Sequence, residues 1–412
     1  MTDYHLPPCP QSELTPITTT LSDFRSIRKK QFLLVDKTAC INTLLRESKV
    51  FLSRPHCFGK SLLLSTIKEL FTNGTKNFEG LAIRDLWDRP CCPVVSLSLF
   101  GLSSPASFEH ELCARLRDAF AQAGFADALK IQTSSFVDLV PELNFLHRNS
   151  DIVLLIDDVD FPLSANLNNR NTFEHNKDVI RKFYAWLRDL QNIEFLMITG
   201  VGRYHDSSLF MPQDIKDISL DPRFASLLGY TQEEVESYFA SHISAVAALR
   251  KCEEGELLEL LKRQYGGYCF DYDAQTSVYC PISINSFFQQ VVDFPEREPV
   301  FGSYWQESSN TASVLRALLN RKRPNFALVE ATQGSGVVIS QSELNNAYAS
   351  DDLNAILTQT GYFTIKQVEH DSRNSTVRRY SCSFPNKEID LAFGMTFFFY
   401  VTNCGPFGSG CR

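Results

Sequence analysis

The stretch VFLSRPHCFGKSLLLS, residues 50–65, places a short apolar run directly before a Gly-Lys-Ser turn. The run from Val50 to Leu52 has the composition of a buried β-strand. After the turn, apolar residues recur at the spacing of one helix face until Asn73, and these residues are Leu63, Ile67, Leu70 and Phe71. The stretch therefore predicts a strand, a loop and a helix that begins at the Gly-Lys-Ser turn.

The Gly-Lys-Ser turn has the residue types of a phosphate-binding loop. Where such a loop joins a strand to a helix, the backbone N–H groups and the positive end of the helix dipole face the phosphates. Lys60 then neutralises the β- and γ-phosphate oxygens, the Ser61 hydroxyl binds Mg²⁺, and Gly59 lets the backbone approach closely. We predict that the whole loop binds the nucleotide: Arg54, Pro55, His56, Cys57, Phe58, Gly59, Lys60 and Ser61.

The loop departs from the usual phosphate-loop pattern at its first position, where Arg54 replaces a glycine. Arg54 and Pro55 must therefore give the turn a different shape. The alternative interpretation is an ordinary helix N-terminus that carries Gly-Lys-Ser by coincidence. From these three residues alone, nucleotide binding and this alternative are equally open.

A second motif, IVLLIDD at residues 152–158, ends a continuous apolar run with two carboxylates. Such a run is typical of a strand buried on both faces of a parallel sheet. Asp157 is predicted to hold Mg²⁺, mostly through water and Ser61, because this cation prefers oxygen ligands and keeps its hydration. Asp158 is predicted to polarise the attacking water. The alternative is a solvated acidic turn that includes Asp160, and the presence of the phosphate loop favours the Mg²⁺ site.

A third motif, FLMITGVGR at residues 195–203, contributes two further candidates. Thr199 lies at the tip of a strand, where related ATPases place a polar group that senses the γ-phosphate. It could equally be an ordinary β-branched strand residue. Arg203 could stabilise the charge of the transition state, in its own chain or toward a neighbouring subunit, and a structural salt bridge is an equal alternative. We predict that Asp158, Thr199 and Arg203 form the catalytic set.

Strand and helix patterns alternate along the first half of the chain. Apolar strand patterns occur at residues 94–100, 152–156 and 195–198, in addition to the strand before the phosphate loop. Helical patterns separate them at residues 107–124 and 180–187. This alternation predicts an α/β domain, a three-layer parallel sheet built from right-handed crossovers.

Changes in composition divide the chain into five segments. Residues 1–20 are rich in Pro, Thr and Ser and are expected to form a disordered leader. The α/β domain covers residues 21–230, and capping and helical patterns predict a mainly helical region at 231–310. Residues 311–390 are expected to be a small mixed α/β region, and residues 391–412 form an atypical tail.

The composition of the 412 residues excludes several classes of protein. The net charge is −8, with 44% hydrophobic and 21% charged residues, so a disordered chain, a fibre and a generally basic nucleic-acid binder are ruled out. No apolar run approaches the length of a membrane-spanning helix. Twelve scattered cysteines without a C-x-x-C motif, and a start that lacks the features of a secretory signal, favour a reducing, cytoplasmic location.

Several motifs together resemble the AAA-ATPase-like proteins of mobile-element or defence-type gene neighbourhoods. The motifs are VDKT (35–38), RPHCFGKSLLLS (54–65), LLIDDVD (154–160), ITGVGR (198–203), DISLDPRFASLLGYTQEEV (217–235), YGGYCF (265–270) and YCPISINSFF (279–288). The similarity extends over residues 21–390. It implies a phosphate-loop (P-loop) ATPase core of the AAA/ASCE type, with an additional central strand, followed by a helical region.

The same family often carries a C-terminal PD-(D/E)XK nuclease-like domain. The chain instead finishes with GMTFFFYVTNCGPFGSGCR, which has no D…E-x-K arrangement, so we predict no nuclease. This tail is expected to be a truncation or an altered end, or to pack as one last strand.

Two motifs differ from the pattern that is usual in the family. His56 and Cys57 replace two arginines of RPRRFGKS, which weakens the positive field around a triphosphate, although Lys60 is retained. Asp158 replaces the glutamate of LIDEYD and shortens the carboxylate by one methylene. Because a misplacement of about 1 Å can cost on the order of a hundredfold in rate, the resemblance implies binding of ATP and slow hydrolysis.

These observations predict a P-loop protein that binds ATP and Mg²⁺, and a slow Mg²⁺-dependent ATPase whose nucleotide state controls the C-terminal region. The alternative is a catalytically silent nucleotide-binding or interaction protein, a remnant of a mobile-element or defence-type ATPase-nuclease. The sequence names no protein partner, and family analogy alone leaves an oligomer and contact with nucleic acid open. The VDKT motif at residues 35–38 has no role that the sequence explains.

Overall fold

The computed structural model describes residues 14–130, 132–204, 214–308, 315, 336–348, 352–371 and 374–404. Its largest sheet has five parallel strands in the order β2 (Val94–Ser98), β3 (Ile152–Asp157), β4 (Ile193–Gly200), β1 (Lys49–Ser53) and β5 (Lys216–Asp217). Strand β4 lies between β1 and β3, as expected for the additional central strand of an AAA-type core. The order also brings the carboxyl ends of β1, β3 and β4 to one edge of the sheet.

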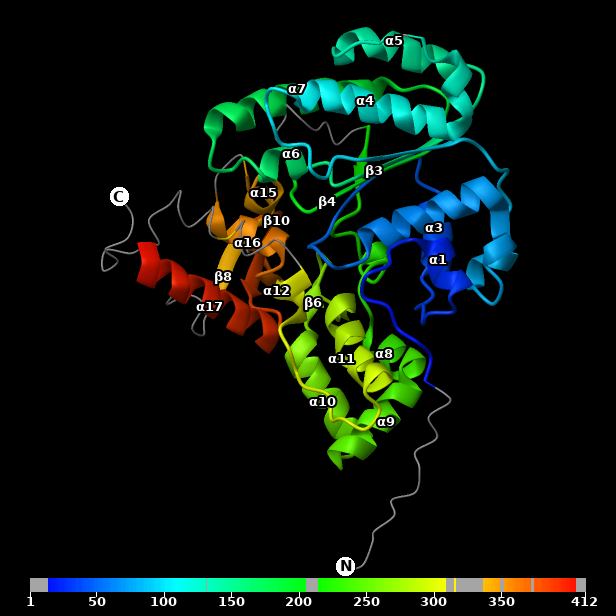
Figure 1. The fold of residues 1–412 in the computed structure, drawn as a ribbon. Helices are drawn as coiled ribbons and strands as arrows, with labels where there is room; N and C mark the ends of the chain where they lie inside the picture. The colour runs from blue at the N-terminus through cyan, green and yellow to red at the C-terminus, as the bar shows by residue number, and fades with distance from the viewer. Residues whose placement is uncertain are drawn as a thin grey trace, which may run out of the picture.

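Helices cover both faces of this sheet (Figure 1). Helix α3 (Lys60–Asn73), with α1 (Phe24–Lys29) against it, packs on one face. The other face carries α4 (Phe108–Phe120), α5 (Phe136–Leu146) and α7 (Arg170–Asp189). Neighbouring strand residues enter different cores, since Leu155 packs on the α3 side and Leu154 on the α4 side. The predicted three-layer α/β fold is confirmed.

Shorter elements connect these layers. Strand β5 has two residues, which is too short for an apolar pattern to reveal, and the sequence did not predict it. Helices α2 (Thr38–Leu44) and α6 (Phe161–Ser164) follow the VDKT motif and the Asp157-Asp158 turn. Single 3₁₀ or π turns lie at Gly74–Asn77, Ala82–Asp85, Ala121–Phe125, Ala126–Ala128 and Pro222–Phe224.

A group of helices follows the sheet and has its own core. It contains α8 (Gln232–Tyr238), α9 (Ala240–Arg250), α10 (Glu254–Tyr265), α11 (Pro281–Asp293) and α12 (Tyr304–Ser308), with a small hairpin of β6 (Tyr268–Cys269) and β7 (Ser277–Val278). The capping box expected from Thr231 and Glu234 begins α8. Ile17 packs into the same core, so residues 14–20 are ordered rather than part of a loose leader, and residues 1–13 lie outside the described chain.

The mixed C-terminal region packs beside the phosphate loop (Figure 1). It contains a three-stranded sheet in the order β8 (Val337–Ser340), β10 (Asn374–Ser383) and β9 (Thr364–Asp371), with α15 (Gln341–Asn345), α16 (Leu353–Thr360) and α17 (Lys387–Cys404). Its buried residues share one core with those of α3.

Two expectations for the tail and for membranes can be compared with the structure. The tail does not form a last strand, because residues 391–404 continue helix α17, and that expectation is wrong. The helix buries Ile389 and Phe393 and leaves Leu391 exposed, whereas a strand would place all three side chains on one face. Within the described ranges, no helix combines the length and apolar character needed to cross a bilayer.

Candidate nucleotide site

The loop at residues 54–59 leaves β1 and enters α3 at the carboxyl edge of the sheet. Gly59 is the N-cap of α3 and has a φ of 93°, a left-handed conformation that glycine adopts without strain. Space alone does not require glycine, since a Cβ atom would lie 3.9 Å from the nearest atom, on Leu228. The first N–H groups of α3 have no acceptor within the helix and are therefore available to an anion.

Lys60 is the first residue of α3, and its side chain folds back into the loop. Its Nζ atom donates to the carbonyl oxygens of Arg54 and Pro55, at 2.9 Å each. The side chain is buried, with 6% of its surface exposed. The loop therefore wraps around the ammonium group and holds one positive charge in front of the helix N-terminus.

The structure brings Ser61, Asp157 and Thr199 into direct contact. Ser61 Oγ donates to Asp157 Oδ2 at 2.6 Å, and Thr199 Oγ1 donates to Asp157 Oδ1 at 2.5 Å. The three residues come from the first turn of α3 and from the ends of β3 and β4. The phosphate loop and the acidic motif therefore lie beside each other, as the predicted Mg²⁺ site requires.

The two other acidic residues of the motif have different environments. Asp158 has a left-handed backbone, with a φ of 51°, and burial together with Asp157 raises the pKa of its carboxyl group to about 7. Asp160 is buried and accepts the N–H groups of Val201 and Gly202 at 2.9 and 2.8 Å. Asp160 therefore ties the end of β3 to the loop after β4 and is not part of a solvated turn.

The first residue of the loop, Arg54, faces away from the Ser61–Asp157 pair. Its guanidinium group donates to the carbonyl oxygens of Ser53 and Ser219 through Nη1 and to that of Phe224 through Nη2. It also stacks over the Phe270 ring, with Cζ 4.4 Å from the ring centroid. The side chain of Arg54 therefore joins the loop to neighbouring segments, and only its backbone carbonyl contacts Lys60.

Arg203 is also engaged in structural contacts. Its Nη2 atom lies 3.3 Å from Asp217 Oδ2, and its Nη1 atom donates to Asn345 Oδ1 at 3.1 Å. Its backbone N–H donates to Gln359 Oε1 at 2.7 Å. The structure thus places Arg203 in the salt bridge that the sequence left as an alternative, and shows no contact between it and Asp157, Asp158 or Thr199 among the described residues.

The two residues that stand in place of arginines add no charge to the loop. Burial and the neighbouring Lys60 lower the pKa of His56 to about 3, so its imidazole is neutral. Burial raises the pKa of Cys57 to about 11, so its thiol is protonated. Phe58 packs edge-on against Tyr268 and Phe270. Lys60 is therefore the cationic side chain that this loop directs toward the Ser61 end.

Comparisons with known proteins show what the chain is similar to. Residues 18–210 match the family model AAA-ATPase_like, described as predicted AAA-ATPase. This segment is similar to the AAA-ATPase-like family. An uncharacterized protein in the vnfD 5′ region of Azotobacter chroococcum mcd 1 is 28% identical over 376 residues, which are 90% of this chain and 67% of that protein. A crystal structure of Cdc6p from Pyrobaculum aerophilum aligns with 90% of this chain and 97% of its own, at 11% identity and a TM-score of 0.35.

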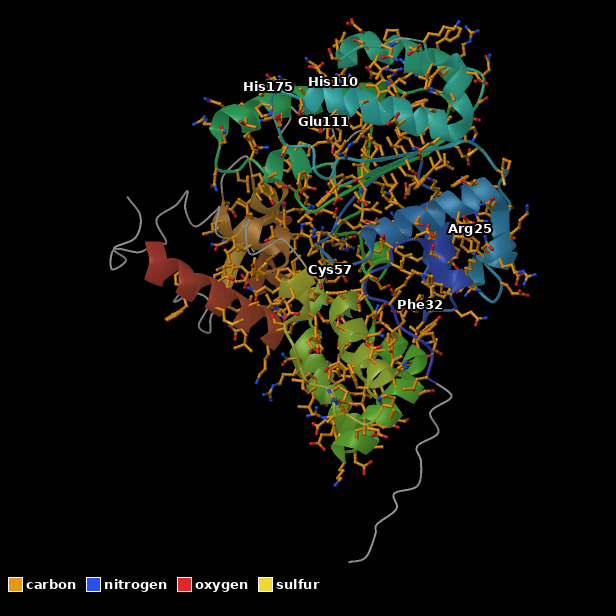
Figure 2. The ribbon with its side chains drawn as sticks, in the orientation of Figure 1. Arg25, Phe32, Cys57, His110, Glu111 and His175 are labelled. Atoms are coloured by element: carbon orange, nitrogen blue, oxygen red, sulfur yellow. The ribbon has the colours of Figure 1, made fainter. Side chains whose placement is uncertain are left out.

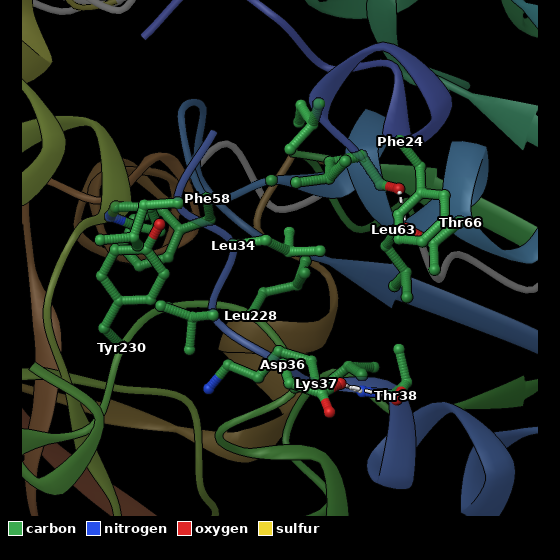
Figure 3. Close-up of a pocket in the computed structure, with 18 of the residues that line it drawn as sticks. Phe24, Leu34, Asp36, Lys37, Thr38, Phe58, Leu63, Thr66, Leu228 and Tyr230 are labelled. Carbon is green, nitrogen blue, oxygen red and sulfur yellow. Dashed lines mark hydrogen bonds between the residues drawn. The ribbon is translucent and has the colours of Figure 1, made fainter. Parts of the chain in front are cut away.

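The AAA-ATPase-like segment contributes most of the wall of a cavity next to the loop (Figure 3). The cavity has a volume of about 110 Å³. Figure 3 shows Phe58 and Tyr230 along one side, and Asp36, Lys37 and Thr38 along another. Leu228 lies between them, and residues 227–230 lead into α8. The cavity therefore lies between the AAA-ATPase-like core and the helices that follow it.

The VDKT motif forms part of this wall, a role that the sequence did not reveal. Asp36 Oδ1 accepts the N–H and hydroxyl groups of Thr38, at 2.8 and 2.6 Å, and this fixes the start of α2. Lys37 Nζ binds both carboxylate oxygens of Glu234, in the first turn of α8, at 2.6 and 2.5 Å. The sequence could have shown the contact between Asp36 and Thr38, because the two residues are close in the chain. It could not have shown the contact of Lys37 with Glu234, which is 197 residues away.

The tip of the loop contacts segments that follow the AAA-ATPase-like core. Cys57 Sγ lies 3.6 Å from the Ser308 carbonyl oxygen in α12, and Cys280 Sγ lies 3.9 Å from the Cys57 carbonyl oxygen. Figure 2 shows Cys57 near the centre of the molecule, where the sheet domain, the helical group and the C-terminal region meet. A Cβ atom on Gly361 would come within 2.7 Å of Pro55. The loop is therefore in contact with all three parts of the molecule.

The residues present fit a nucleotide and a divalent cation. Ser61 and Asp157 offer a hydroxyl and a carboxylate oxygen, which suit Mg²⁺ because this ion takes few protein ligands and keeps water for the rest. The described residues contain no group of three or more His, Cys, Asp or Glu side chains that could hold a metal ion. Lys60 and the free N–H groups of α3 supply the donors that phosphate oxygens need.

Proposed function

We propose that this protein binds ATP together with Mg²⁺ and hydrolyses the γ-phosphate slowly. The observation that carries the proposal is the contact of Ser61 and Thr199 with the same carboxylate, Asp157, in front of the N-terminus of α3. A solvated acidic turn gives no reason for the loop serine and the strand-tip threonine to converge on one side chain. An ion-binding carboxylate beside a phosphate loop gives that reason.

Each side chain then has a defined part in binding. Lys60 exchanges the carbonyl oxygens of Arg54 and Pro55 for the β- and γ-phosphate oxygens, which are stronger acceptors because they are charged. Ser61 and Asp157 hold Mg²⁺, which neutralises charge on the same phosphates. Thr199, fixed by Asp157, reports on whether the γ-phosphate is present, since any shift of the carboxylate moves its hydroxyl group.

The proposed turnover is slow for two reasons that concern the residue at position 158. The carboxylate of Asp158 reaches less far than that of the usual glutamate, and small misplacement of a catalytic group is costly. Its raised pKa also leaves a substantial fraction protonated near neutral pH, and a protonated carboxyl group cannot polarise water as a base. Both effects lower the rate without lowering affinity for the nucleotide.

The cavity beside Phe58 suits the base of the nucleotide. It opens next to Gly59 and Leu62, so a ligand with its phosphates on α3 can extend into it. Apolar and aromatic groups such as Phe58, Leu228 and Tyr230 provide most of its surface, which is typical of sites that bind flat ring systems. Because residues 227–230 lead into α8, the base would lie between the core and the helical group.

We further propose that the nucleotide state changes the position of the C-terminal region. Three contacts support such coupling: Pro55 packs against Gly361, Cys57 contacts Ser308, and the Arg203 N–H donates to Gln359. The first two begin on the loop that must rearrange when Lys60 turns toward phosphate. The third begins four residues after Thr199, at the end of the strand that meets Asp157.

Calorimetry and phosphate release test the two parts of this proposal separately. Titration of ATP with Mg²⁺ into the full chain should show binding, which Lys60→Ala should weaken at least tenfold and Lys68→Ala, an exposed lysine on the same helix, should leave unchanged. Asp158→Glu should raise phosphate release while binding stays the same. Binding without release in both the wild type and Asp158→Glu would favour the catalytically silent alternative, and no binding at all would overturn the proposal.

A further inference from the structure

A second cavity lies behind the phosphate loop and belongs to none of the roles described above. It has a volume of about 40 Å³ and is lined by the end of β1, the loop after β4, the segment after β5, residues 269–270 and the C-terminal region. The polar side chains in its lining are Ser53, Arg54, Arg203, Ser219, Thr358, Gln359 and Thr364. Because a cavity of about 10–15 Å³ already holds one water molecule, there is room here for a small ligand.

Two guanidinium groups border this cavity and are almost completely buried. The exposed fraction is 1% for Arg54 and 5% for Arg203. Arg54 uses Nη1 and Nη2 on backbone carbonyl oxygens, whereas its Nε–H group has no hydrogen-bond partner within the described part of the chain. A buried donor of this kind is destabilising unless a ligand accepts its hydrogen bond. The Nε–H group is thus an unused donor on a cationic side chain that lines the cavity.

A second unused donor comes from Ser219, which is also buried. Ser219 Oγ accepts the N–H group of Ser53 at 2.8 Å. In the ranges that the structure describes, no acceptor is found for the hydrogen of this hydroxyl group. Thr364 and Gln359 differ in this respect, because Thr364 Oγ1 donates to the Cys269 carbonyl oxygen and Gln359 Nε2 donates to that of Leu344. The unused donors are therefore Arg54 Nε–H and the Ser219 hydroxyl.

The charges around the cavity are not balanced by its described neighbours. Arg54 and Arg203 bring two positive charges, and Asp217 is the carboxylate that pairs with Arg203. Burial lowers the pKa of Arg54 to about 9, and the proximity of Arg203 contributes to the same shift. The Phe270 ring under Arg54 offsets only part of a full charge.

We propose that this cavity binds one monovalent inorganic anion of halide size, held by Arg54 Nε–H, the Ser219 hydroxyl and the charge of Arg203. A water molecule could accept hydrogen bonds from both unused donors but would leave the buried charge uncompensated. A halide ion accepts several donors at once and cancels the excess charge. Chloride fits this description, because two unused donors suit a single-atom anion better than a tetrahedral oxyanion, which has four acceptor oxygens.

The proposed anion lies where the phosphate loop meets the C-terminal region. Arg54 is the residue whose carbonyl oxygen accepts Lys60, and Arg203 is bonded through Gln359 and Asn345 to the C-terminal region. The ion therefore fastens the rear of the phosphate loop to the C-terminal region. This role does not depend on nucleotide binding, so it can be tested separately from the proposed ATPase activity.

Bromide, which has the charge of chloride and a strong anomalous signal, tests the site directly. The full chain is purified in sodium gluconate, whose anion is too large for the cavity, and is melted with increasing bromide at constant ionic strength. We expect a saturable rise in melting temperature with bromide. Crystals grown with bromide should show an anomalous peak next to Arg54 Nε. Electron density for water alone at this position, or melting curves that respond equally to bromide and gluconate, would overturn the proposal.

A matched pair of serine variants makes the test specific. Ser219→Ala removes one donor and should raise the half-saturating bromide concentration by about tenfold or more, the usual value of one hydrogen bond to a charged group. Ser226→Ala changes a half-buried serine in the same segment that does not line the cavity, and should leave the bromide response unchanged. An equal response in the two variants counts against the assigned ligands. If Ser219→Ala does not fold, the anomalous map of the wild type decides.

Discussion

The loop at residues 54–61 has two sides with different chemistry. On the Lys60 side, a lysine, a serine and a carboxylate from β3 form a small polar cluster next to a helix N-terminus. On the Arg54 side, a buried guanidinium group binds three backbone carbonyl oxygens and faces the C-terminal region. The two cations are six residues apart; in the proposed function Lys60 exchanges its two carbonyl acceptors for those of a ligand, whereas Arg54 keeps its three. The loop can therefore act as a joint between a ligand site and the rest of the molecule.

The largest effect that separates the two sides should come from Arg54→Met. This change leaves the carbonyl oxygens of Ser219 and Phe224 without their donor in a buried place, so we expect the free energy of unfolding to fall by about 3–5 kcal/mol. Lys60→Met should cost less than half as much, although it removes nucleotide binding. Urea denaturation of both variants measures the difference, and equal losses of stability would show that the two sides do not differ in the way we describe.

The sequence predicts the direction of Ser61 but not that of Arg54. The contact of Ser61 with Asp157 follows from the fold, because the carboxyl ends of parallel strands meet at one edge of the sheet, and both motifs end strands. The direction of Arg54 does not follow from any local pattern. It depends on carbonyl oxygens 165 and 170 residues later in the chain, in a segment whose position only the complete fold determines.

The same reasoning explains which other elements and contacts the sequence predicts and which it does not. The strands β1 to β4 were visible as apolar runs, while the two-residue β5 offered no periodicity to detect. The apolar composition of residues 391–404 suited both a strand and a helix, and only packing against the core selected the helix. The motif VDKT lines a cavity because Lys37 meets Glu234, a contact between segments that a single sequence does not connect.

A second test concerns Glu388, which connects α17 to α11 and α12 behind the phosphate loop. Glu388 lies in the first turn of α17, is buried, and accepts the Ser283 hydroxyl at 2.7 Å and the Trp305 N–H group at 2.9 Å. Burial raises the pKa of its carboxyl group from 4.5 to about 7. The folded state therefore binds this proton more tightly than the unfolded chain does. Its stabilising effect is fully present below pH 4.5 and is lost as the pH rises through about 7.

We expect the stability of the wild type to fall by about 3 kcal/mol relative to Glu388→Gln between these two pH values, since one pKa unit corresponds to about 1.4 kcal/mol. Denaturation curves of both proteins at several pH values measure this difference. Glu256→Gln, which changes an exposed glutamate of α10, is the control and should follow the wild type. Parallel curves for the wild type and Glu388→Gln would contradict a proton held by Glu388.

A third test breaks the contact between the loop and the C-terminal region. Gly361 has a φ of 94°, and an added Cβ atom would come within 2.7 Å of Pro55, a rigid ring. We expect Gly361→Ala to lower stability by about 2–3 kcal/mol, from backbone strain and from this clash together. Gly80→Ala isolates the strain, because Gly80 has a φ of 75° and nothing lies within 4 Å of the added atom, so it should cost only about 1 kcal/mol. Equal losses in a thermal unfolding experiment would show that Pro55 moves aside freely.

The smallest expected effect concerns the pair that joins the VDKT motif to α8 on the Lys60 side. Lys37 and Glu234 keep 16% and 22% of their side-chain surface exposed, so water screens only part of their attraction. A double-mutant cycle with Lys37→Met and Glu234→Gln should give a coupling energy of about 1 kcal/mol. The pair of Arg84 and Glu79, with exposed fractions of 50% and 85%, should give a value near zero in the same cycle.

If ATP binds between the core and the helical group, the Lys37→Met change should also weaken ATP binding a few-fold, because the wall of the base cavity loses its tie to α8. Unchanged affinity together with a measurable coupling energy would place the base elsewhere and leave Lys37 with a purely structural role.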